Sequence, residues 1–79
     1  MNELISLKDL KPGQSARVDL LFLPKIIRKR LRDIGLIEGT VVKCIMKSPA
    51  GDPVAYDIRG CVIALRLEDL TNIMAFKND

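Results

Sequence analysis

The chain has no histidine and no tryptophan, and its aromatic residues are two phenylalanines and one tyrosine. Histidine is the commonest general base in enzymes and a preferred ligand of transition metals, so the chain lacks the usual means for acid–base catalysis and metal binding. No G-x-x-x-x-G-K phosphate loop occurs, and Ser6, Ser15 and Ser48 have no base to activate them. We therefore predict that the protein is not an enzyme and holds no metal ion and no cofactor.

Long apolar segments are also missing. Apolar residues come in short runs such as 20–23, whereas a helix that crosses a bilayer needs about 20 of them. Glu3 stands where a secretion signal would carry positive charge, and no small-residue cleavage site follows an apolar stretch. These features predict a cytoplasmic protein.

Cysteine is scarce as well. Cys44 and Cys61 are far apart and form no C-x-x-C pair, which argues against a zinc knuckle or a redox site. Both lie within apolar strand patterns, where free cysteine behaves as a small hydrophobic residue. We expect both to be buried free thiols.

The length and composition nevertheless suit a folded protein. A chain of 79 residues has room for one core, and 48% hydrophobic with 29% charged residues is too apolar for a disordered segment. We expect a single domain over residues 1–79.

One helix is predicted after Pro24, which suits a first helical turn. Gly35 supplies the left-handed residue that ends a helix, and Leu36 can fold back on the last turn. The apolar stripe of this helix recurs at spacings of four and three: Ile27, Leu31 and Ile34.

The rest of the chain favours strands and short turns. Ser6 and Asp9 have the spacing of a helix cap, but Pro12 allows only one helical turn, and a second short turn is expected over 67–70. Asp52 and Asp57 are interpreted as turn residues that flank a hairpin loop. Alternation of apolar and polar residues predicts strands over 14–20, 41–46, 54–58, 61–65 and 73–76, followed by a frayed tail over 77–79. Four or five short strands with one helix predict a mostly β fold that closes into a small barrel.

Basic side chains crowd the predicted helix, opposite its apolar stripe: Lys25, Arg28, Lys29, Arg30 and Arg32. Lys29 and Asp33 are spaced to pair. Three interpretations remain open for this face: a solvated surface, a docking surface for an acidic protein, or a nucleic-acid patch. The net charge is only +3 and few rings are available for base stacking, so no nucleic-acid partner is expected.

Several short motifs together resemble the FeoA family of ferrous-iron-transport accessory proteins. The motifs are Leu7-x-x-Leu10-x-Pro12-Gly13, Arg30-Leu31-x-x-Ile34-Gly35-Leu36-x-x-Gly39-Thr40, Gly51-Asp52-Pro53, Arg59-Gly60 and Ala64-Leu65-Arg66. The resemblance spans nearly the whole chain. It implies an SH3-like barrel and a cytosolic role in ferrous iron uptake through contact with the membrane transporter FeoB.

Two alternatives stay beside this interpretation. Related SH3-like domains follow a winged-helix part in iron-dependent repressors, so a nucleic-acid-binding or iron-regulatory module remains an alternative, although this sequence shows no winged-helix part. Self-association into homo-oligomers is also open. Under the FeoA interpretation the candidate partner-binding residues are four basic side chains of the helix and two apolar residues before it: Arg28, Lys29, Arg30, Arg32, Phe22 and Leu23.

Overall fold

The computed structural model describes residues 3–78, which form six strands, two α-helices and one 3₁₀ turn. Each strand is hydrogen-bonded to its neighbours in a single antiparallel sheet of order β1-β6-β2-β3-β4-β5. The elements are β1 (Glu3–Ser6), η1 (Leu7–Asp9), β2 (Ser15–Leu21), α1 (Lys25–Asp33), β3 (Val41–Lys47), β4 (Val54–Ile58), β5 (Cys61–Leu65), α2 (Leu67–Leu70) and β6 (Ile73–Asn78).

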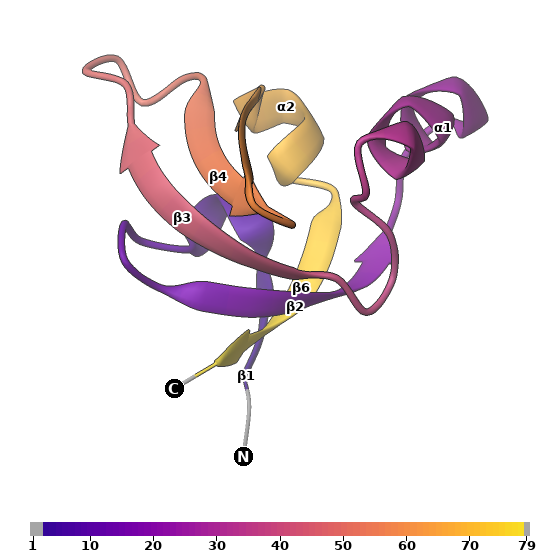
Figure 1. The fold of residues 1–79 in the computed structure, drawn as a ribbon, viewed down its shortest axis with the longest axis horizontal. Coiled ribbons are helices and arrows are strands. Elements are labelled where there is room, and N and C mark those ends of the chain that lie inside the picture. Colours follow the sequence, from indigo (N-terminus) through magenta and orange to yellow (C-terminus); the bar gives the residue numbers. More distant parts are fainter. Residues whose placement is uncertain (1–2, 79) are drawn as a thin grey trace.

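The sheet is strongly curved but open. Figure 1 shows β3 and β2 sweeping across the molecule with β4, α2 and β6 above and behind them, while α1 stands to one side. The strands β1 and β5 lie at the two ends of the order and are not paired with each other. The predicted mostly β fold is confirmed, whereas the predicted closure of the barrel is wrong.

Alternating side chains build the core. In β4 the side chains of Val54, Tyr56 and Ile58 are all buried, as their spacing of two predicts for one face of a strand. The hydroxyl of Tyr56 donates a hydrogen bond to the carbonyl oxygen of Leu7 at 3.2 Å, which ties β4 to the η1 turn. This hydroxyl lies deep in the core, and its burial raises the pKa of Tyr56. The nearby Cys44 raises that pKa further.

The helix α1 begins after Pro24 and ends as predicted. Gly35 has φ +94°, and the Leu36 amide donates to the Leu31 carbonyl oxygen at 2.8 Å, which is the six-to-one bond of a Schellman motif. Leu36 and Leu31 are both buried. Ile34, predicted to lie on the apolar stripe, is instead 39% exposed, because the helix has already ended at Asp33.

Both chain ends differ from the predictions. The strand β1 was not predicted; it pairs with β6 from Glu3 opposite Lys77 to Ser6 opposite Met74. Lys77 and Asn78 belong to β6 and are therefore not frayed, while Asp79 lies outside the described residues. Ser6 makes no capping bond, and its hydroxyl donates to the carbonyl oxygens of two residues at the end of α2, Leu70 and Thr71.

The two cysteines have different environments. Cys44 is a fully buried free thiol, as predicted, and burial raises its pKa, an effect that the nearby Lys47 partly opposes. Cys61 is a free thiol but is exposed, so the prediction of two buried thiols is wrong for this residue. It stands at the start of β5, directly after a tight turn, where little packs against it.

Within residues 3–78, α1 and α2 are both too short and too polar to traverse a lipid bilayer.

Candidate functional site

A groove of about 660 Å³ opens beside α1. Side chains from the helix form one wall, and the other side comes from the end of β2 and the loop between α1 and β3. The lining residues are Leu21, Lys25, Ile26, Arg28, Lys29, Arg32, Leu36, Ile37 and Glu38.

The lining residues divide into an apolar group and a charged rim. The apolar members include Ile26, which is 70% exposed, and Ile37, which is 38% exposed. Burial of such a side chain against another molecule would contribute about 0.8 kcal/mol for each CH₂ group removed from water. The rim carries four cations and one carboxylate, that of Glu38. The groove therefore combines apolar contact area with a positive field.

None of the four rim cations forms an ion pair closer than 4.0 Å within residues 3–78. Within residues 3–78 the one ion pair closer than 4.0 Å joins Arg66 to Asp52, away from the groove. The pairing predicted between Lys29 and Asp33 is not formed. Positive charges without internal partners leave the groove ready to attract an anionic ligand or an acidic protein surface.

The structure separates the six predicted site residues. Arg28 and Lys29 line the groove together with Arg32, whereas Arg30 is exposed on another side of the helix. Phe22 is 63% exposed but does not line the groove, and Leu23 is partly buried against the core.

Sequence reasoning missed the apolar part of the groove. Ile26 lies off the stripe of Ile27 and Leu31, and an isoleucine between basic residues on the polar side of a helix is a signal that could have found it. Leu21 and Ile37 carry no such signal, because only the fold brings the end of β2 next to the loop after α1.

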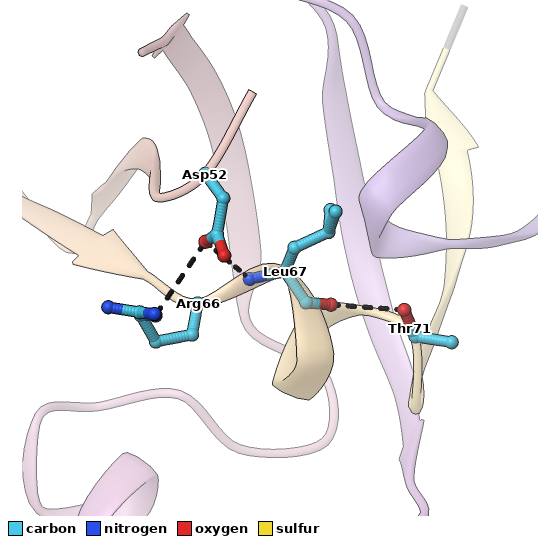
Figure 2. A network of polar contacts seen from close by, with 4 residues as sticks. All are labelled: Asp52, Arg66, Leu67 and Thr71. Atoms are coloured by element: carbon cyan, nitrogen blue, oxygen red, sulfur yellow. Dashed lines mark hydrogen bonds and ion pairs between the residues drawn. The ribbon is translucent and has the colours of Figure 1, made fainter. Parts of the chain in front are cut away.

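A second polar feature is structural and fixes the loop between β3 and β4 (Figure 2). The Leu67 amide donates to Asp52 Oδ1 at 2.9 Å, and Arg66 Nε lies 3.8 Å from the same oxygen. Asp52 thereby caps α2 from a distant loop, instead of bonding within its own turn as predicted. Asp57 does act as a turn residue, since Gly60 donates its amide to Asp57 Oδ1 at 3.0 Å.

Residues 3–78 contain no group of three or more cysteine, aspartate or glutamate side chains placed to hold a metal ion. The titratable groups with shifted pKa values, Cys44 and Tyr56, lie in the core and not in the groove. The groove itself presents charged and apolar side chains for contact with another molecule.

Solved structures share this fold. An FeoA protein from Chlorobium tepidum is 29% identical, with a TM-score of 0.87 over 91% of this chain and 69% of that one. An FeoA-like protein from Clostridium acetobutylicum is 27% identical, with a TM-score of 0.82 over 95% and 87% of the two chains. FeoA from Stenotrophomonas maltophilia, solved in complex with zinc and described as a prokaryotic SH3 domain protein, is 25% identical, with a TM-score of 0.75 over 90% and 88%.

The architecture of this chain is accordingly SH3-like, with the sheet left open between β1 and β5. A comparison with curated proteins gives no significant match. The model of the FeoA domain matches residues 5–75, which is most of the chain. The chain therefore belongs to the FeoA family.

Proposed function

We propose that this protein is a cytosolic accessory of ferrous iron transport, which acts by binding the cytosolic region of an FeoB-type membrane transporter. Its membership of the FeoA family supports the role in iron transport. The observation that carries the contact is the groove beside α1, which is lined by exposed apolar side chains and by four cations that form no ion pair within residues 3–78. Such a surface matches an acidic protein surface that offers an apolar residue to the groove.

The protein acts by contact and not by catalysis. The chain has no histidine, and the groove presents no nucleophile paired with a base. In an interface of this kind an apolar anchor supplies most of the affinity, while the rim charges steer the encounter and set its orientation. Ile26 and Ile37 are the residues that would receive the anchor, and Arg28, Lys29 and Arg32 would meet carboxylates around it.

Charge reversal tests the proposal. We expect Arg28→Glu combined with Arg32→Glu to weaken capture of the transporter's purified cytosolic domain by about tenfold or more, corresponding to about 1.4 kcal/mol. Both side chains are exposed, so the fold should be retained. Lys8→Glu with Lys11→Glu changes the net charge by the same amount at exposed positions outside the groove and serves as the matched control.

Binding is measured by surface plasmon resonance with the transporter domain immobilised, or by isothermal titration calorimetry. Folding of each variant is checked by circular dichroism. Equal capture by the groove variant and the control variant would reject the groove as the contact site. Ile26→Asp provides a second test, because it removes the exposed apolar contact and adds a negative charge without touching the core.

A further inference from the structure

The strand β5 is an edge of the sheet, and no segment of residues 3–78 is hydrogen-bonded along its outer side. It pairs with β4 on one side and ends the strand order on the other. Its five residues carry no charge and no proline, and its pairing with β4 has no bulge. Natural proteins usually guard edge strands with lysine, proline or bulges, because an open edge invites another strand to add to the sheet.

The turn before β5 determines which of its backbone groups face outward. Arg59 has φ 52° and Gly60 has φ 85°, the positive angles of a type I′ hairpin turn. In such a turn the flanking residues, Ile58 and Cys61, form a hydrogen-bonded pair, and hydrogen-bonded and non-hydrogen-bonded pairs then alternate along the ladder. Val62 and Ala64 therefore direct their amide and carbonyl groups away from β4, toward the free edge.

This edge is accessible. Val62 is 69% exposed and Ala64 is also exposed. Within residues 3–78 no other segment and no side chain forms a hydrogen bond with the outward groups of β5. Two donors and two acceptors at fixed strand spacing are thus left for another chain.

Charge at the two ends of the edge points to the chemistry of that chain. Arg59 stands before β5 and has no ion pair within residues 3–78, while Arg66 follows β5, is 68% exposed and has only Asp52 at 3.8 Å. We propose that β5 binds an extended segment of a partner protein as a seventh strand. The segment would be apolar in its centre, opposite Val62 and Ala64, and would carry acidic residues at both ends.

A second copy of this chain fits the edge less well. An antiparallel self-pairing that uses all the outward groups places Val62 opposite Ala64 of the other copy. Arg66 of each copy then lies opposite Gly60 of the other copy and next to its Arg59. Two arginines therefore meet at each end of the ladder. Like charges facing each other across paired strands are destabilising, whereas acidic ends on a partner segment would be attracted.

The test uses a fluorescein-labelled synthetic peptide of alternating valine and threonine with two glutamates at each end. Its counterpart carries lysines in place of the glutamates. We expect the glutamate peptide to bind at least tenfold more tightly by fluorescence anisotropy. In hydrogen-exchange NMR it should protect the amides of Val62 and Ala64, which we expect to exchange rapidly in the free protein because they have no hydrogen-bond partner within residues 3–78.

Two variants locate the bound strand. Val62→Glu places a negative charge on the edge, facing the acidic peptide, and Ala64→Pro removes an outward donor while leaving the bonds to β4 intact, so both should weaken the glutamate peptide at least tenfold. Val41→Glu is the matched control, because Val41 is 53% exposed on β3 and lies away from the edge. Should Ala64→Pro fail to fold, Val62→Glu by itself still tests the proposal.

The groove variant Arg28→Glu with Arg32→Glu should bind the peptide as the wild type does. The peptide experiment therefore tests the β5 edge independently of the proposed contact between the groove and the transporter. Absence of protection at Val62 and Ala64, or equal binding of both peptides, would overturn the proposal. A dimer seen by sedimentation that Val62→Glu dissociates would also overturn it, since the edge would then belong to a second copy.

Discussion

At the scale of single residues, Tyr56 shows how one buried polar atom links stability to pH. Its hydroxyl donates to the Leu7 carbonyl oxygen, and burial raises its pKa above the ordinary value of about 10. The neutral phenol is the form that the core accepts. Above pH 10 the unfolded chain ionises this group while the folded protein does not, so stability is present below that pH and is lost as pH rises.

We therefore expect Tyr56→Phe to flatten the alkaline loss of stability. The wild type should lose up to about 1.4 kcal/mol per pH unit above pH 10 through this group, and the variant should not. At neutral pH the variant should be less stable by about 1 kcal/mol, because the hydrogen bond to Leu7 is lost. Urea unfolding at pH 7 to 11 measures both effects.

The buried thiol of Cys44 also titrates in alkali, since burial raises its pKa. The comparison is therefore repeated in a Cys44→Ala background, which leaves Tyr56 as the buried group that differs. Parallel stability curves for the wild type and Tyr56→Phe in that background would contradict the assignment.

At the scale of elements, the end of α1 depends on Gly35 and on the side chain that lies over it. Gly35 has φ +94°, and a Cβ placed there would lie 2.9 Å from Arg59 Cδ. The backbone angle is the larger obstacle, because a residue with a Cβ pays about 1–2 kcal/mol for a left-handed conformation, whereas the end of an arginine can move.

Gly35→Ala is accordingly expected to destabilise the fold by about 1–2 kcal/mol, with little dependence on Arg59. In a double-mutant cycle with Arg59→Ala, the two changes should add within about 0.5 kcal/mol. Recovery of most of the loss when Arg59 is shortened would instead show that the contact, and not the backbone, sets the cost. Denaturant unfolding of the four proteins gives the result.

These elements also show what local sequence can predict. The alternation of Val54, Tyr56 and Ile58 and the pair Gly35 and Leu36 specify strand β4 and the helix end, because the signals lie within a few residues. Strand β1 has no such signal. Its four residues become a strand only through pairing with β6 at the other end of the chain, and of its side chains Ile5 is the one that packs against the core.

The candidate site, like the fold, could be predicted from the sequence only where its signals are local. The basic face of α1 is visible in the sequence, but the groove needs Leu21 and Ile37, which the folded chain brings to the helix from elsewhere. The prediction that Cys61 is buried was wrong. Cys61 shares one face of β5 with the buried Leu65, but its position beside the turn leaves it exposed to solvent.

At the scale of the whole molecule, the fold divides into a packed sheet and a peripheral helix. The buried core draws mainly on β2, β3, β4 and β6, whereas α1 contributes Leu31 as its buried residue and Ile27 as a partly buried one. Figure 1 shows the helix standing apart from the strands that form the core. Segments with few buried contacts open at lower free energy than the global transition.

We therefore expect the backbone amides of 29–33 in α1 to exchange through local opening, at free energies several kcal/mol below those of the central strands β2 and β6. Native-state hydrogen exchange by NMR in increasing urea measures this. The α1 amides should show little dependence on urea, because local opening exposes little surface, while the strand amides should follow the global slope. A shared slope and free energy for α1 and β2 would mean that helix and sheet unfold as one unit. Because α1 forms one wall of the groove, a helix that opens separately would change the width of the groove without disturbing the core.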